Sequence, residues 1–166
     1  MIDIVRIPED RTAALIGRNG STKKKIEKMM KVQLEIREND VELIGEDLDV
    51  IYARDIIKAI GRGFSPKEAL KLLDDEYQLL VLNAKDYTRR NLEPVIARII
   101  GTRGKAKKII EEYTRTRISI YGKTVSIIGT VHDIYIAAEA IEMLLNGSPH
   151  KNVYLYLENV KAKNKI

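Results

Sequence analysis

The chain has 166 residues, 45% of them hydrophobic and 32% charged, which supplies a core for one domain or two small ones and excludes a disordered chain. Cysteine is absent and the two histidines, His132 and His150, are far apart in sequence, which excludes disulfides and thiol catalysis and argues against a metal site. The net charge of +5 favours a polyanionic partner.

The N-terminal residues do not resemble a signal peptide, and no apolar run approaches the length of a membrane span. We therefore expect a cytoplasmic protein without membrane contact. From the composition we expect neither a metal nor another cofactor.

The first half of the chain predicts a compact order of strands and helices around one glycine-edged turn, Gly17-Arg18-Asn19-Gly20. Hydrophobic periodicity and turn residues predict a strand at 2–7, helices at 9–16 and 21–31, strands at 32–37 and 41–45, and a helix at 48–60. The turn lies between the first two helices.

A joint at residues 61–66 ends this half, and Ser65 and Pro66 begin a short helix at 67–73. The connector that contains this helix is too apolar for a free linker, so we expect it to pack between two domains. After a strand at 77–82 and a helix at 92–100, the second half matches the first at an offset of 84 residues, with Gly101 on Gly17 and Gly104 on Gly20. One fold is therefore used twice.

The last residues come after a loop at 146–150. Val153, Leu155 and Leu157 alternate with other residues, which predicts a possible final strand. A basic end comes next, with Lys161, Lys163 and Lys165. The predicted divisions are 1–64 and 77–150 for the two domains, 65–76 for a helical connector and 151–166 for a basic extension.

The repeated turn has the chemistry of an anion site. Glycines permit positive φ and let another backbone approach closely. The turn precedes a helix N-terminus, where free N–H groups and the helix dipole favour an anion, and lysines come next in the helix. A ligand-free bend between helices is the alternative, and its recurrence in register makes it the weaker one. The pattern indicates a sugar-phosphate backbone as ligand.

The motif I-G-x-x-G-x-x-x-K, in this order of elements, resembles the KH RNA-binding domain, and the strand before the first helix implies its type I form. The fold implied is α+β: two tandem β-α-α-β-β-α domains, each with a three-stranded antiparallel sheet packed on three helices. In KH domains this loop clamps the backbone of unpaired nucleotides. The resemblance implies an RNA-binding set made of the two clamps and nearby basic residues: Gly17, Arg18, Asn19, Gly20, Lys23, Lys24, Gly101, Thr102, Arg103, Gly104, Lys105, Lys107, Lys108 and Arg117.

The resemblance also implies an apolar groove for bases beside each clamp. Its floor would include Ile16, Leu34, Ile36, Ile100, Ile118 and Ile120. Most of these residues are expected to be core, because a groove needs only one or two of them exposed.

A narrower resemblance covers the whole chain. The stretch at 59–73 is similar to the matching part of the small-subunit ribosomal-RNA-processing KH proteins, the archaeal Dim-two-like and eukaryotic partner-of-Nob-one family. Its sequence is Ala-Ile-Gly-Arg-Gly-Phe-Ser-Pro-Lys-Glu-Ala-Leu-Lys-Leu-Leu. The resemblance implies a monomer that binds single-stranded RNA near the 3′ end of small-subunit rRNA during ribosome assembly. It also implies two protein partners, the 3′-end endonuclease of rRNA and the alpha subunit of initiation factor two.

Charge predicts which copy is the main RNA anchor. Residues 1–64 hold twelve basic and twelve acidic residues, whereas residues 77–150 hold eleven and seven. The first copy also carries acidic residues around its middle strands, including Glu35 and Glu42, where the second has Ser119 and Ser126. If these carboxylates border the groove they repel RNA, and the second copy is the anchor. They could equally lie on the far, solvated side.

Catalysis is not expected, because the acidic residues are scattered and no nucleophile–base grouping or phosphate-loop lysine motif is present. The competing function is a KH-fold adaptor that docks proteins and binds RNA weakly or not at all. Affinity for short single-stranded RNA distinguishes the two.

Overall fold

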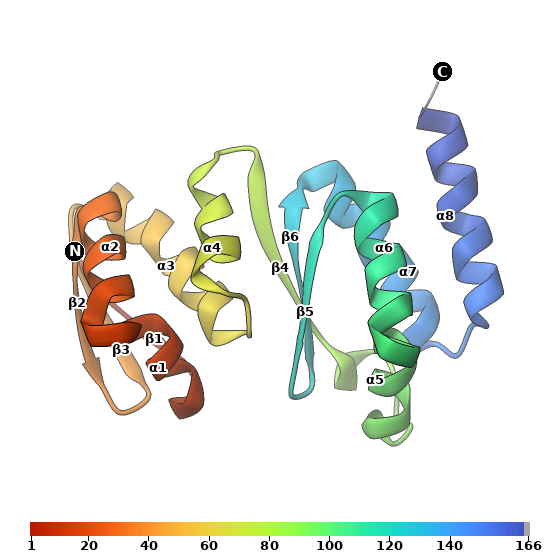
Figure 1. Cartoon of the computed structure of the whole chain (residues 1–166), viewed down its shortest axis with the longest axis horizontal. Coiled ribbons are helices and arrows are strands. Elements are labelled where there is room, and N and C mark those ends of the chain that lie inside the picture. The colour runs from red at the N-terminus through yellow and green to blue at the C-terminus, as the bar shows by residue number, and fades with distance from the viewer. Residues whose placement is uncertain (165–166) are drawn as a thin grey trace. The chain divides into compact units, whose positions relative to one another are not determined.

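The computed structural model describes residues 1–164 (Figure 1). The order of elements predicted for the first half is confirmed. They are β1 (Ile2–Arg6), α1 (Glu9–Ile16), the 3-10 turn η1 (Arg18–Gly20), α2 (Ser21–Met30), β2 (Val32–Arg37), β3 (Asp40–Gly45) and α3 (Asp47–Gly61).

The joint forms α4 (Pro66–Ala69) and the 3-10 turn η2 (Leu70–Leu73). The second half repeats the order of the first and adds a helix at its end. Its elements are β4 (Tyr77–Asn83), η3 (Ala84–Asp86), α5 (Leu92–Ile100), η4 (Thr102–Gly104), α6 (Lys105–Thr114), β5 (Arg117–Tyr121), β6 (Thr124–Thr130), α7 (Val131–Leu145) and α8 (His150–Asn164).

Each half contains one three-stranded antiparallel sheet, in which the last strand lies in the centre. The orders are β1-β3-β2 and β4-β6-β5. The α+β class and the tandem arrangement predicted from sequence are therefore confirmed. Two compact units result, Met1–Asp75 and a second that begins at Glu76.

Side chains alternate between the two faces of each sheet, and the helices cover one face. In the first sheet the covered face holds Val5, Leu34 and Leu43, all buried against α1–α3. Leu34 pairs with Leu43 across the strands, and the next pair along, Glu35 with Glu42, faces the other way. The register therefore separates an apolar helix-side face from an outer face that carries carboxylates.

An arginine from the helix before each clamp ties that helix to the end of the unit's long helix. In the first unit, Arg11 Nε donates to the carbonyl of Ile60 at 2.8 Å and Arg11 Nη2 to that of Phe64 at 2.9 Å. In the second unit Arg98 Nη2 donates to the carbonyl of Ser148 at 2.7 Å. The Ile60 carbonyl also accepts from Gly63 N at 3.1 Å, whereas Phe64 and Ser148 lie in the segments just after α3 and α7.

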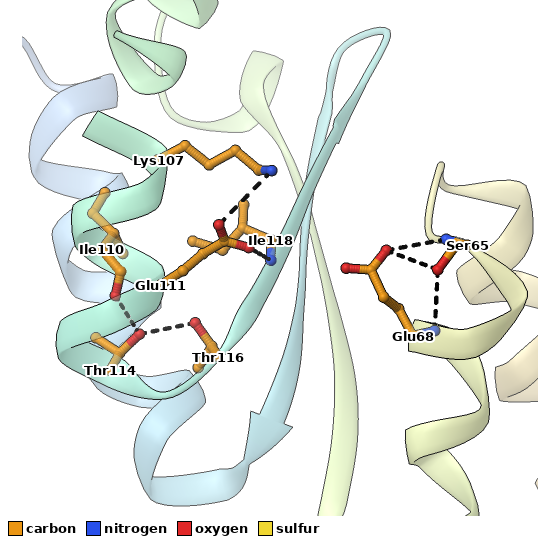
Figure 2. Close-up of polar contacts among 8 residues, drawn as sticks. All are labelled: Ser65, Glu68, Lys107, Ile110, Glu111, Thr114, Thr116 and Ile118. Carbon is orange, nitrogen blue, oxygen red and sulfur yellow. Dashed lines mark hydrogen bonds and ion pairs between the residues drawn. The ribbon is translucent and has the colours of Figure 1, made fainter. Parts of the chain in front are cut away.

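The connector belongs to the first compact unit. Ser65 caps α4 through a reciprocal arrangement with Glu68, in which Glu68 N donates to Ser65 Oγ at 3.1 Å and Ser65 N donates to Glu68 Oε1 at 3.2 Å (Figure 2). Ala69 and Leu72 are buried, and both α4 and η2 pack against α3.

The final segment is a helix, so the predicted strand there is wrong. Val153 and Leu157 are buried and lie four residues apart on one face of α8, whereas Leu155 between them is exposed. Alternation over so short a stretch fits either structure, and packing against α6 and α7 selects the helix. The basic residues Lys161 and Lys163 lie in its last turn, and Lys165 is outside the described residues.

We predict that Arg11→Ala lowers the stability of the first unit by about 2–3 kcal/mol, because two partly buried carbonyls lose a charged donor. Hydrogen exchange of the α1 and α3 amides reports this unit by itself. Arg6→Ala is the matched control, since Arg6 is exposed and pairs only with Asp40, at 3.4 Å. Equal losses in the two variants would contradict the anchoring role of Arg11.

Candidate nucleic-acid interface

The two glycine-edged turns, hereafter the first clamp (17–20) and the second clamp (101–104), have nearly the same backbone. Gly17 has φ 74° and ψ 179°, and Gly101 has φ 77° and ψ 173°. The third residue is left-handed in both, Asn19 at φ 55° and Arg103 at φ 56°. Both turns lead directly into a ten-residue helix. The duplication in sequence is therefore a duplication in conformation.

The first glycine of each clamp is required by the fold. A Cβ at Gly101 would lie 2.6 Å from the backbone nitrogen of Ala106, and one at Gly17 would lie 2.8 Å from that of Thr22. Only glycine lets the incoming helix end approach the next helix so closely.

The last glycine of each clamp faces open space. A Cβ at Gly20 or Gly104 would meet nothing within 4 Å. Both have positive φ, near 75°, which already favours glycine. The bare backbone there leaves room for a ligand to approach the N-terminus of α2 or α6, where the helix dipole favours an anion.

The basic residues predicted around the second clamp fall into two groups. Arg103, Lys105 and Lys108 are exposed on the clamp and the first turns of α6. Lys107 is half-buried and pairs with Glu111 at 3.9 Å. Glu111 also accepts from the backbone nitrogen of Ile118 at 2.9 Å (Figure 2). Lys107 thus takes part in fastening α6 to β5, in addition to any role toward a ligand.

The first clamp has the same division of its lysines. Lys24 is exposed, whereas Lys23 pairs with Glu27 at 3.8 Å. Glu27 accepts from the backbone nitrogen of Leu34 at 3.0 Å. Arg18 and Asn19 are exposed at the tip of the turn, as Thr102 and Arg103 are in the second clamp.

The apolar residues predicted for the groove also divide. Leu34 and Ile118 are fully buried and belong to the core. Ile16 and Ile100, each 36% exposed, immediately precede the clamps. Ile36 and Ile120 are half-buried. Of the residues predicted for the groove, those exposed enough to contact a base are therefore the isoleucines beside each clamp and those on β2 and β5.

Two arginines of the second copy do not lie with the clamp. Strand alternation places Arg117 on the face of the sheet opposite Ile118, hence away from the helices. Arg115 comes after the C-terminal end of α6, and ten residues of α-helix are about 15 Å long. The structure thus brings together all the predicted site residues of this copy except Arg117.

The carboxylates of the first copy lie on the far side. Glu35 and Glu42 face each other on the outer surface of the sheet, opposite the helices. The alternation of strand 32–37 already carried this signal, because Glu35 lies between the buried Leu34 and the half-buried Ile36. Of the two positions considered for these carboxylates, the structure supports the far side.

Close to its clamp the first copy is the more basic of the two. Residues 17–31 contain six Lys or Arg and one Glu, and residues 101–115 contain five and two. The excess charge of the second half therefore lies farther from the clamp. A stronger binding of RNA at the second clamp would therefore have to come from the electrostatic field of these more distant charges, or from contacts between the protein and the bases.

A pair of lysines in the second unit was missed by the sequence analysis. The pKa of the exposed Lys123, in the β5–β6 hairpin, is lowered by its neighbour Lys85, which lies just after β4. Ala84 N donates to the carbonyl of Lys123 at 2.9 Å and holds the two segments together. Their closeness depends on the β4–β6 register, which no local pattern in the sequence reveals.

Among residues 1–164, no helix is long and apolar enough to span a membrane. No group of three or more His, Asp or Glu side chains in the same range is placed to hold a metal ion.

Comparison with protein families decides the assignment. The model of the eukaryotic-type KH domain, KH type I, matches twice, at residues 10–78 and 78–162. The chain belongs to the type I KH-domain family of Dim2 and Pno1 proteins. The second match extends through most of α8, and the first reaches past the connector, so each repeat includes the segment after its third helix.

Relatives span both archaea and eukaryotes. A KH domain-containing protein of Methanocaldococcus jannaschii is 44% identical over 98% of this chain and 75% of its own length. The pre-rRNA-processing protein pno1 of Aspergillus fumigatus is 36% identical over 67% of this chain and 46% of its own. The chain thus spans about half the length of the eukaryotic relatives that it matches.

A solved complex contains a similar chain. It is described as an a/eIF2alpha–aDim2p–rRNA complex from Pyrococcus horikoshii. The matching chain is 45% identical with a TM-score of 0.93, and the match covers 98% of this chain and 95% of that one.

The two glycines of a clamp predict different consequences of substitution. Gly101→Ala should destabilise the second unit by about 3 kcal/mol or more, because the methyl group meets backbone in a region of φ and ψ reserved for glycine. Gly104→Ala should cost only about 1–2 kcal/mol, the strain of a left-handed alanine. Urea unfolding of the two variants measures the difference, and the reverse order would contradict this division of roles.

Proposed function

We propose that the protein binds single-stranded RNA through both clamps. The observation that carries the proposal is their shared geometry: two turns of the same conformation, each presenting an open glycine edge and exposed basic residues at a helix N-terminus. Backbone N–H groups and lysines at such a site suit phosphates, and the isoleucines beside it suit the faces of unpaired bases.

The RNA proposed as ligand is the small-subunit rRNA near its 3′ end, bound during ribosome assembly. Support comes from relatives described as pre-rRNA-processing proteins and from the solved complex of a similar chain with rRNA. The same complex supports the alpha subunit of initiation factor two as a protein partner. The 3′-end endonuclease remains a prediction from family resemblance, as does the monomeric state.

The role proposed is one of binding and not of catalysis, carried out in the cytoplasm. Within residues 1–164 the clamps are surrounded by lysine, arginine and isoleucine, without a grouping of carboxylates that could hold catalytic metal. Such a site can hold and orient a strand for an enzyme that acts on it.

The second clamp is tested by Thr102→Asp with Arg103→Asp. Both side chains are exposed, and Asp tolerates the left-handed backbone of position 103, so the fold should persist. We expect affinity for a short single-stranded RNA to fall at least about a hundredfold, because two carboxylates replace the clamp's cation beside the phosphates. Fluorescence anisotropy with a labelled oligonucleotide measures it.

The control for this variant carries the same change in charge elsewhere in the unit. Lys151→Asp with Asn152→Asp alters two exposed residues of α8 by the same total of charge. If it weakens RNA binding as much as the clamp variant, the effect is only that of net charge. If the clamp variant binds RNA unchanged, the proposal fails and the adaptor function is favoured.

The first clamp is tested by Arg18→Asp with Asn19→Asp, the counterpart substitutions. We predict a smaller loss than at the second clamp in low salt, because the second half carries the protein's excess positive charge. The gap should narrow as salt is raised from about 0.05 M to about 0.2 M, since screening removes the longer-range field and leaves the local charge, which is more positive at the first clamp. A loss at the first clamp equal to or larger than at the second, in low salt, would refute the ranking.

A further inference from the structure

The last helix of the second unit forms one wall of a hollow that has a counterpart in the first unit. In the second unit a hollow between the C-terminal end of α6 and the start of α7 is bordered by α8. In the first unit the same hollow lies between α2 and α3. The five positions lining both, at the offset of 84, are 29/113, 30/114, 31/115, 49/133 and 52/136. We call the hollow of the first unit the α2–α3 groove.

In the second unit the fifteen-residue α8 packs against α6 and α7 beside this hollow (Figure 1). Leu157 of α8 is 1% exposed, and Ile136 of α7, which lines the same hollow, is 7% exposed. Lys161 Nζ lies 5.0 Å from the centre of the Tyr113 ring, a cation–π contact. The side chains of α8 that border the hollow are thus spaced at i, i+3 and i+4: Leu157, Val160 and Lys161.

In the first unit the corresponding segment is too short to do this. The segment after α3 is only α4 and η2, and it ends at Leu73 before the chain enters β4. Tyr52, the counterpart of Ile136, is 47% exposed, and Met29, the counterpart of Tyr113, is 45% exposed. Leu73, which borders the groove, is 40% exposed. The apolar surface that α8 covers in one unit is therefore open in the other.

The charges at the groove repeat those beneath α8. Asp49 lies where Asp133 lies in the second unit, and Asp75 adds a second carboxylate at the rim. A lysine placed as Lys161 is placed on α8 would approach these carboxylates and the Met29 side chain. Lys31 also lines the groove, so its lining holds two carboxylates and one ammonium group and keeps a net negative charge that attracts a lysine.

We propose that the α2–α3 groove binds an amphipathic helix of a partner protein, laid across it as α8 is laid across α6 and α7. The helix would present two apolar side chains three residues apart, followed directly by a lysine, in the pattern of Leu157, Val160 and Lys161. This is the helix-in-groove mode of recognition, in which apolar anchors at helical spacing supply the affinity.

The groove is separate from the RNA site. The first clamp lies at the N-terminal end of α2, and Met29 and Met30 lie at its other end, about 15 Å away along ten residues of helix. A helix in the groove and RNA on the clamp can therefore be bound together. The proposal does not depend on RNA binding, and it is tested without RNA.

The test uses the four methionines of the intact chain, of which two lie in the groove. The protein is labelled with ¹³C on the methionine methyl groups and titrated with a peptide of residues 150–164, stapled between positions 151 and 155 because a free helix of this length is marginal in water. Both stapled positions are exposed in α8. We expect saturable NMR shifts of Met29 and Met30, while Met1 and Met143 stay unchanged.

Substitutions locate the site. Tyr52→Asp should weaken peptide binding by about tenfold or more, because a charge replaces an apolar anchor. Ile2→Asp changes an exposed apolar residue on the sheet of the same unit, outside the groove, and should leave peptide binding unchanged. Absence of shifts at Met29 and Met30, or shifts of Met143 alone, would overturn the proposal, the latter because the peptide then only displaces α8. Shifts at Met29 that depend on protein concentration without peptide would make a second copy the occupant and also overturn it.

Discussion

The arrangement of each unit depends on one steric constraint, the contact between a glycine and the helix after it. At Gly101 the backbone lies so near the nitrogen of Ala106 that a methyl group would be 2.6 Å from it. This contact sets the angle between α5 and α6 and brings their apolar faces onto one side of the sheet. At the exposed end of the turn, a Cβ on Gly104 would meet nothing within 4 Å. The proposed ligand site and a folding requirement thus share four residues.

Glu111 and its counterpart Glu27 extend that constraint to the sheet. Each accepts a backbone N–H from the first half of β2 or β5. Each also pairs with a lysine one turn closer to the clamp. The clamp, the helix and the strand beside it are therefore linked by a few short-range contacts in both copies. A strand held in this way fixes the position of Ile36 or Ile120 relative to the clamp, as the proposed groove for bases would require.

Local chemistry made much of the fold predictable from the sequence, but not the end of the chain or the placing of charge. Glycine pairs, helix starts and alternating strands predicted the order of elements, and the offset of 84 showed that it occurs twice. The alternation at 153–157 fits a strand, and only packing on α6 and α7 makes residues four apart the buried ones. Similarly, the strand register turns Glu35 and Glu42 away from the clamp and makes Lys85 a neighbour of Lys123. The number of charged residues in a sequence therefore predicts the sign of a partner's charge better than the position of the site that binds it.

The two copies differ most in the segment after the third helix, and connectivity is the reason. The first copy must lead into β4, so its last segment is short and ends at Leu73, whereas the second continues as α8 for fifteen residues. Both copies thus have an apolar surface on their second and third helices. Among the described residues, a long helix packs on that surface only in the second copy. Burying that surface stabilises the second unit, and leaving it open in the first costs about 25 cal/mol for each Å² of apolar surface exposed to water. The proposed partner helix would bury this surface in the first unit as α8 packs on its counterpart in the second.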